Sequence, residues 1–63
     1  MPMIRVELLE GRTVEQKREF AAVVTREAAR ILNCSPDVVD VVFVPVAREN
    51  WAIGGKLTSD SSS

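Results

Sequence analysis

The first apolar segment of the chain alternates in period two. One row of side chains in it is wholly apolar, namely Pro2, Ile4, Val6 and Leu8, and the other row is mixed. Successive side chains of a strand point to opposite faces, so the alternation predicts a β-strand over residues 2–9. Glu10-Gly11-Arg12 then breaks the pattern, and Gly11 can adopt the positive φ of a turn.

A period of three to four residues follows this turn. Thr13 and Gln16 stand three residues apart, which fits a capping box at the start of a helix. Apolar residues recur beyond the box at helical spacing, namely Phe20, Ala21, Val23, Val24, Ala28, Ile31 and Leu32. The pattern predicts an amphipathic helix of about five turns that ends at Asn33, with its charges on a solvated face.

A second strand is predicted after a short turn. Ser35 and Pro36 fit the cap and first position of one helical turn, and residues 38–46 are β-branched almost throughout. Pro45 belongs near a strand end or on a sheet edge, because it cannot donate a ladder hydrogen bond. Strand, helix and strand in so short a chain predict an α/β (α+β) fold with a parallel pair and a right-handed crossover.

The remaining residues predict an arm and a tail. Residues 48–57 read as a turn followed by a short hairpin-like arm around Gly54-Gly55. Trp51, a single large aromatic residue in this arm, is typical of an anchor at an interface or pocket. Residues 58–63 contain no apolar side chain and predict a flexible Ser-rich tail. The single domain is therefore expected to span residues 1–57.

The size of the chain favours oligomerisation. A domain of 63 residues buries only about 60% of its unfolded surface, and small chains add disulfides, a metal or further subunits. Cys34 is the single cysteine and histidine is absent, which excludes an internal disulfide and argues against a metal cluster. The second strand is apolar on both faces, so we expect another subunit to cover the face that the helix leaves open.

Charge and hydropathy exclude several classes of partner. The net charge is −1 with interspersed signs, which gives no basic surface for nucleic acid. No apolar run approaches the roughly 20 residues that cross a bilayer, and the N-terminus lacks the features of a signal peptide. We expect a cytoplasmic protein without nucleic-acid or membrane partners, in which Cys34 is a reduced thiol and a small hydrophobe.

Pro2 is the candidate for chemistry. Removal of Met1, which is expected before so small a residue, leaves Pro2 with a free secondary amine. An ordinary α-amino group has a pKa of about 7.7–8.0, and an apolar pocket or a nearby cation lowers this pKa by disfavouring the charged form. Such an amine can act as a base near neutral pH. A proline at position 2 is weak evidence for catalysis by itself, so the evidence has to come from the rest of the sequence.

Several segments together resemble the 4-oxalocrotonate tautomerase family, from Pro2 to about Leu57. They are Met1-Pro2, Leu8-Leu9-Glu10-Gly11-Arg12-Thr13, Glu15-Gln16-Lys17 and Trp51-Ala52-Ile53-Gly54-Gly55. The resemblance implies a β-α-β subunit with a short C-terminal hairpin arm, dimers with a four-stranded sheet, and a hexamer of three dimers. It also implies an isomerase without a cofactor, which interconverts enol and keto forms of a small unsaturated 2-oxo (di)carboxylate.

The resemblance gives roles to individual residues. Pro2 becomes the general base and then acid, and Arg12 the cation that binds a substrate carboxylate through its planar guanidinium. Trp51 makes the pocket apolar and helps to lower the Pro2 pKa, and the Leu9 backbone orients substrate or water. Asp40 departs from the best-studied dicarboxylate tautomerases, which have a second arginine there that reaches a neighbouring subunit's site.

Alternatives stay open at this point. A carboxylate at Asp40 repels an anionic substrate at close range, and Arg48 or Arg5 is the available substitute cation. If Asp40 is merely a solvated strand-start residue, the chain is a tautomerase. If Asp40 activates water while Pro2 donates a proton, the chain is a hydratase or dehalogenase of an unsaturated acid. The third alternative is a non-catalytic subunit of a homo-oligomer, or of a hetero-hexamer with a homologous chain.

Overall fold

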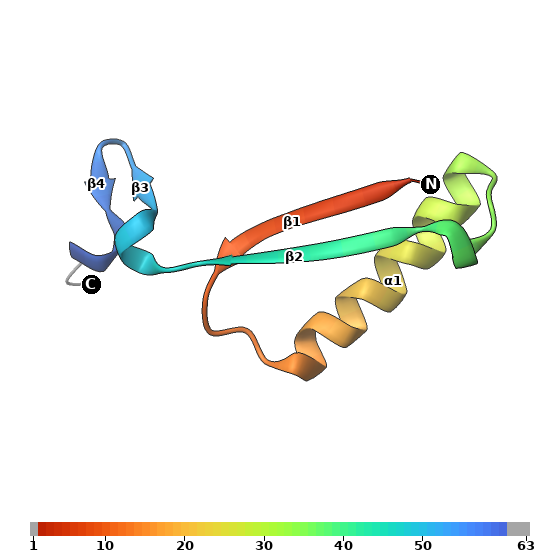
Figure 1. Cartoon of the computed structure of the whole chain (residues 1–63), viewed down its shortest axis with the longest axis horizontal. Coiled ribbons are helices and arrows are strands. Elements are labelled where there is room, and N and C mark those ends of the chain that lie inside the picture. The colour runs from red at the N-terminus through yellow and green to blue at the C-terminus, as the bar shows by residue number, and fades with distance from the viewer. Residues whose placement is uncertain (1, 61–63) are drawn as a thin grey trace.

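The predicted order of strand, helix and strand is present in the structure, a computed structural model that describes residues 2–60. Its strands and helix are β1 (Met3–Leu9), α1 (Val14–Leu32), β2 (Asp40–Val46), β3 (Ala52–Ile53) and β4 (Lys56–Leu57). Three short 3-10 turns are η1 (Pro36–Val38), η2 (Arg48–Asn50) and η3 (Thr58–Asp60). β1 and β2 are parallel neighbours, and α1 crosses them (Figure 1).

α1 begins and ends where its sequence predicts. The Gln16 amide donates to the Thr13 hydroxyl at 3.1 Å, and the Thr13 amide donates to the Gln16 side chain at 3.0 Å. This capping box satisfies backbone groups that have no partner within the helix. Asn33 ends the helix in the left-handed conformation, with φ 58°, and its amide donates to the Ala29 carbonyl.

β2 is shorter than the predicted strand of residues 38–46. It begins at Asp40, because the preceding residues form η1 instead. The Asp37 amide donates to the Ser35 hydroxyl at 3.2 Å, which caps this turn and draws Val38 into it. The predicted helical turn after Ser35 is therefore confirmed, and it takes the first residues of the apolar run out of the sheet.

Even-numbered residues make the hydrogen bonds between β1 and β2. The Asp40 amide donates to the Pro2 carbonyl at 2.9 Å at one end of the pair, and the Glu10 amide donates to the Val46 carbonyl at 3.0 Å at the other. Backbone groups of successive strand residues point to alternate sides, so odd-numbered residues face the outer edges. Pro45 therefore lies next to the end of β2 with its nitrogen at the outer edge, where no ladder bond is lost.

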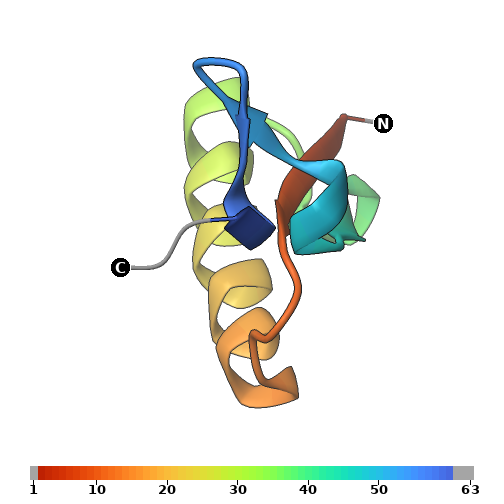
Figure 2. The ribbon, with the colours of Figure 1, turned by 90° about the vertical axis from the view of Figure 1, so that its left-hand side faces the viewer.

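α1 lies against one face of the strand pair (Figure 2). Phe20 of α1 and Phe43 of β2 meet edge to face, with ring centroids 6.1 Å apart. The other face, called the open face below, carries Met3, Arg5, Glu7 and Leu9 from β1 and Asp40, Val42, Val44 and Val46 from β2. Met3 is 66% and Val42 is 38% exposed on it, so apolar side chains of this face remain in contact with solvent in a single chain.

A single copy of the chain buries little of its surface. Among residues 2–60 only Ala29 is buried. The accessible surface is 4951 Å² for 6.9 kDa, whereas a compact monomer of this mass exposes about 4,000 Å². The radius of gyration is 14.9 Å, against about 11 Å for a compact chain of this length. A single folded chain thus exposes apolar surface that a small domain has to bury in order to be stable.

The predicted hairpin arm is formed by β3 and β4 and projects beyond the end of β2 (Figure 1). Gly54 and Gly55 make its two-residue turn, with φ 61° and 83°. Both values are positive, as a type I′ hairpin turn requires, and glycine adopts them without steric strain. Among the described residues, no helix has the length and apolar character needed to cross a membrane.

The arm ends in an ordered turn rather than in the free tail that the composition predicts. The Thr58 hydroxyl donates to the Arg48 carbonyl at 2.7 Å, and the Thr58 amide donates to the Trp51 carbonyl at 2.8 Å. These two bonds tie the start of the predicted tail to η2, so Thr58–Asp60 form η3. The remainder of the predicted tail, residues 61–63, and Met1 lie outside the described residues.

Candidate active site

Pro2 and Asp40 lie together at the amino end of the parallel pair. Pro2 is half-buried, Asp40 is exposed, and the hydrogen bond from the Asp40 amide to the Pro2 carbonyl joins the two backbones. The register pairs Asp40 with Met3, so Asp40 belongs to the open face, whereas Pro2 falls in the row of Ile4 on the face that α1 covers. The two residues are neighbours along the sheet but belong to opposite faces of it.

Arg12 lies at the other end of β1, in the loop that leads to α1. Gly11 precedes it with φ 118°, a value that glycine adopts readily and that turns the chain out of the strand. β1 has seven residues, and a strand rises about 3.3 Å per residue, so the Cα atoms of Pro2 and Leu9 are about 20 Å apart. Arg12 follows Leu9 in the chain, beyond the far end of the strand. A single chain does not bring these two predicted site residues together.

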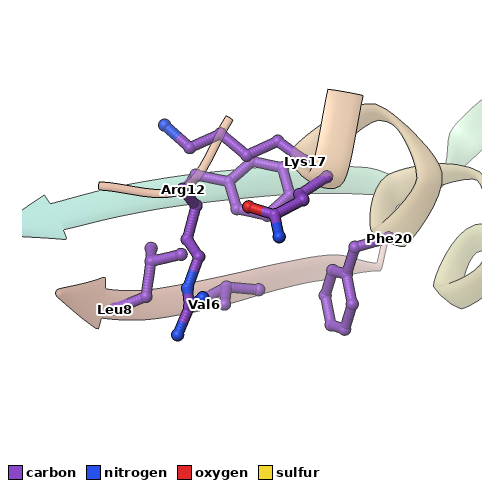
Figure 3. A pocket seen from close by; sticks show the side chains of 7 residues that line it. Val6, Leu8, Arg12, Lys17 and Phe20 are labelled. Atoms are coloured by element: carbon purple, nitrogen blue, oxygen red, sulfur yellow. The ribbon is translucent and has the colours of Figure 1, made fainter. Parts of the chain in front are cut away.

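Arg12 borders an apolar hollow between the sheet and the first turns of α1 (Figure 3). The hollow has a volume of about 290 Å³, and the side chains that line it are Val6, Leu8, Arg12, Gln16, Lys17, Phe20 and Phe43. The Arg12 side chain reaches past Leu8 toward Val6, and the Lys17 side chain extends along another edge of the hollow (Figure 3). We call this cavity the Arg12 hollow.

Leu9 and Trp51 lie at the carboxyl end of the strand pair, as Arg12 does. Leu9 is the last residue of β1, half-buried and paired with Val46. Trp51 follows η2 and is half-buried, and its amide donates to the Arg48 carbonyl at 3.3 Å. Three of the four predicted site residues thus lie at or beyond the carboxyl end of the strand pair, and Pro2 lies at its amino end.

The two substitute cations considered from the sequence have other partners. Arg5 pairs with Glu7 at 3.1 Å on the open face. Arg48 donates to the Thr58 carbonyl at 3.4 Å, within the arm. Neither lines the Arg12 hollow. Residues 2–60 also contain no group of three or more Cys, Asp or Glu side chains placed to hold a metal ion.

Sequence reasoning missed three residues that surround Arg12, namely Lys17, Phe20 and Phe43. A signal for Lys17 was available, because it stands three residues before Phe20 and seven before Val24. At helical spacing this puts Lys17 on the apolar stripe of α1 rather than on its charged face. Phe43 had no comparable signal, since only the register of β2 against β1 brings it to this hollow.

Comparison with known proteins identifies the family of the chain. A family model described as tautomerase enzyme matches residues 2–61. The chain belongs to the tautomerase family. This tautomerase is 35% identical over 60 residues to the 2-hydroxymuconate tautomerase of Bacillus subtilis (strain 168), a match that covers 95% of this chain and 97% of that protein. The names of the family and of this relative identify the chain as an isomerase of the tautomerase type.

Solved structures show the same fold. A crystal structure of a 4-oxalocrotonate tautomerase homologue matches this tautomerase with a TM-score of 0.93 and 41% identity, over 100% of both chains. The heterohexameric 4-oxalocrotonate tautomerase of Chloroflexus aurantiacus J-10-fl matches with a TM-score of 0.91 and 30% identity, over 95% of this chain and 97% of that one. The predicted family and the β-α-β tautomerase subunit are therefore confirmed.

Proposed function

We propose that the chain is a cofactor-independent tautomerase in which Pro2 shuttles a proton between the enol and keto forms of a small unsaturated 2-oxo (di)carboxylate. The observation that carries the proposal is the family match, which begins at Pro2 itself. After removal of Met1, the neutral secondary amine takes a proton from an enol oxygen or from a carbon beside a carbonyl. The resulting ammonium then returns this proton to another carbon of the conjugated system.

Arg12 is proposed to bind a substrate carboxylate, and it does so in a site that two copies of the chain complete. Because Pro2 and Arg12 lie at opposite ends of β1, one copy is proposed to supply the base and another to supply the guanidinium. Leu9 and Trp51 lie at the Arg12 end, so they are proposed to line the site from the same copy as Arg12. The apolar surface of Trp51 is proposed to disfavour an ammonium ion and thereby to lower the pKa of the Pro2 amine, and the Leu9 backbone is proposed to orient substrate or water.

The edge of β1 supports a particular way of pairing the copies. The outer edge of β1 presents the amide and carbonyl groups of Met3, Arg5, Glu7 and Leu9, whereas the outer edge of β2 lacks a donor at Pro45. An unpaired and uninterrupted edge is the better template for another strand. Antiparallel pairing through β1 gives a four-stranded sheet with both helices on one face. It also lays the Pro2 end of one copy beside the Leu9–Arg12 end of the other.

The open face supports a larger assembly. Pairing through strand edges leaves both open faces of the dimer on the same side, with Val42, Val44 and Val46 still uncovered. Packing of three such faces against one another would bury them, and we propose a homohexamer of three dimers. The heterohexamer among the structural relatives supports an assembly of this size. Native mass spectrometry of the purified chain tests this assembly. A single species with six times the mass of the chain is expected, and a smaller species would contradict the proposal.

The test of the reaction is ketonisation of phenylenolpyruvate, followed in the ultraviolet, on protein whose intact mass confirms the loss of Met1. In the Pro2→Ala variant a primary amine replaces the secondary amine of the terminus, and the rigid position of the ring nitrogen is lost. We expect the rate to fall by about 100-fold or more, in the range of the contribution of a positioned general base. An unchanged rate in assembled Pro2→Ala protein would reject the mechanism.

A second candidate function uses Asp40. The hydrogen bond between the Asp40 amide and the Pro2 carbonyl joins the two residues at the same end of the sheet, although their side chains belong to opposite faces. A carboxylate that reaches the amine would favour a protonated Pro2. In this hydratase, Asp40 takes a proton from water, the water oxygen adds to the unsaturated acid, and Pro2 protonates the neighbouring carbon. With a halogenated acid the same addition gives a halohydrin, which then breaks its carbon–halogen bond and loses hydrogen halide to leave a carbonyl group. Loss of hydration in Asp40→Asn, with tautomerisation retained, would favour this function. No effect on either reaction would reject it.

A further inference from the structure

Lys17 and Arg12 share one hollow, and neither has an anionic partner among residues 2–60. The other cations of α1 are each paired with a glutamate. Arg18 lies 3.9 Å from Glu15, Arg26 lies 4.0 Å from Glu27, and Arg30 lies 2.7 Å from Glu27. The two cations that face the hollow are therefore the uncompensated ones on this part of the molecule, and an anion bound there would compensate them.

The surroundings of Lys17 differ from those of its neighbours on the helix. Lys17 is half-buried, whereas Gln16 and Arg18 beside it are exposed. Its stem lies along the apolar side of α1, so the ammonium is held at the edge of the hollow instead of on the charged face. A charge kept close to apolar surface is favourable when an anion pairs with it.

The shape of the Arg12 hollow fits a ligand with an apolar middle and two anionic ends. Val6, Leu8, Phe20 and Phe43 form apolar walls, and the side chains of Arg12 and Lys17 follow different edges of the space between them (Figure 3). The volume of about 290 Å³ is near the lower end of the range for small-molecule sites, about 300–1,000 Å³. A short unsaturated chain with a carboxylate at each end matches this distribution of charge and apolar surface.

We propose that Lys17 is the second cation of the substrate site and selects dicarboxylates, with Arg12 on one carboxylate and Lys17 on the other. This proposal rests on the proposed function for the reaction itself, although not for the binding. Lys17 would supply the second positive charge, since this chain has Asp40 at the start of β2 where the best-studied dicarboxylate tautomerases have a second arginine. Lys17 acts here on the substrate only, while proton transfer stays with Pro2.

Turnover of two substrates by Lys17→Met tests the proposal. Methionine keeps the apolar stem and removes only the charge. We expect kcat/KM for 2-hydroxymuconate, a dicarboxylate, to fall about tenfold or more, which corresponds to about 1.4 kcal/mol. For phenylenolpyruvate, a monocarboxylate, we expect a change of less than about threefold, because Arg12 alone holds its single carboxylate. Lys17→Arg should restore the dicarboxylate rate, and Lys56→Met on the arm should leave both rates unchanged.

Binding of trans,trans-muconate by calorimetry separates this proposal from the proposed function, because muconate carries two carboxylates and no enol proton. Pro2→Ala should bind it, and the Pro2→Ala, Lys17→Met double variant should bind it about tenfold more weakly. Lys17-dependent binding of muconate, together with a parent protein that turns over neither substrate or a Pro2→Ala protein that keeps the parent rate, would overturn the proposed function and support the second cation. Equal affinities, or equal losses for both substrates in Lys17→Met, would overturn the second cation even if turnover depends on Pro2.

Discussion

Leu8 and Pro45 lie opposite each other in the parallel pair, and the Pro45 nitrogen faces the outer edge of β2. The arrangement leaves β1 with the uninterrupted edge, so Arg5→Pro should block assembly by removing an outward amide there. Val41→Pro removes the matching amide on the outer edge of β2, imposes the same restriction on φ, and should leave assembly intact. Sedimentation velocity measures both.

Arg5→Ala is the control for the ion pair of Arg5 with Glu7 on the open face. Exposed pairs contribute about 0–1 kcal/mol, so this variant should sediment like the parent protein. Equal sedimentation of Arg5→Pro and the parent protein would contradict pairing through β1.

Pro2 and Arg12 at opposite ends of β1 predict that two inactive variants restore activity when they are mixed. After co-refolding of Pro2→Ala with Arg12→Ala, each mixed dimer holds one site with both residues intact and one with neither. Half of the dimers are mixed after random pairing, so about a quarter of the sites regain function. The rate of phenylenolpyruvate ketonisation measures this recovery. A site complete within one chain would show no recovery.

The fold could be predicted from the sequence because its local signals agree. The capping box at Thr13 and Gln16, the terminator Asn33 and the Gly54-Gly55 turn each have a local physical cause, and each occurs where it was predicted. The start of β2 could not be placed, because the propensity of Val38 for a strand is overridden by the Ser35 cap. The ordered turn at Thr58 could not be predicted either, since it depends on hydrogen bonds to Arg48 and Trp51.

The candidate site was only partly accessible to sequence reasoning. Pro2 was a candidate because its free amine can act as a base, Arg12 followed from the family resemblance, and the roles of both stay predictions. The apolar walls around Arg12 depend on contacts between residues distant in sequence, such as Phe20 with Phe43. The residues that line the Arg12 hollow therefore cannot be predicted without the register of β2 against β1, which the alternation of side chains alone does not determine.

Asp40 should change the pH dependence of the reaction. The Asp40 amide binds the Pro2 carbonyl, and a carboxylate close to an amine favours its ammonium form. If the Asp40 carboxylate acts on the amine, Asp40→Asn should therefore lower the pKa of the amine. Tautomerisation needs the neutral amine, so the rising limb of kcat/KM against pH should move to lower pH. Asp37→Asn in η1 is the control, and an unmoved limb in Asp40→Asn would show that Asp40 does not act on the amine.

Thr58 should control the exposure of Trp51, because its hydroxyl and amide close the arm onto η2. Thr58→Val removes the 2.7 Å hydrogen bond to the Arg48 carbonyl but keeps the size of the side chain. A hydrogen bond contributes about 1 kcal/mol, so the arm should open more often. Trp51 is the single tryptophan, and quenching of its fluorescence by acrylamide reports the opening directly. Quenching should increase in Thr58→Val and stay at the parent level in Thr58→Ser, which retains the hydroxyl. Equal quenching in all three proteins would show that other contacts hold the arm, and a matching rise in KM for Thr58→Val would link the position of Trp51 to substrate binding.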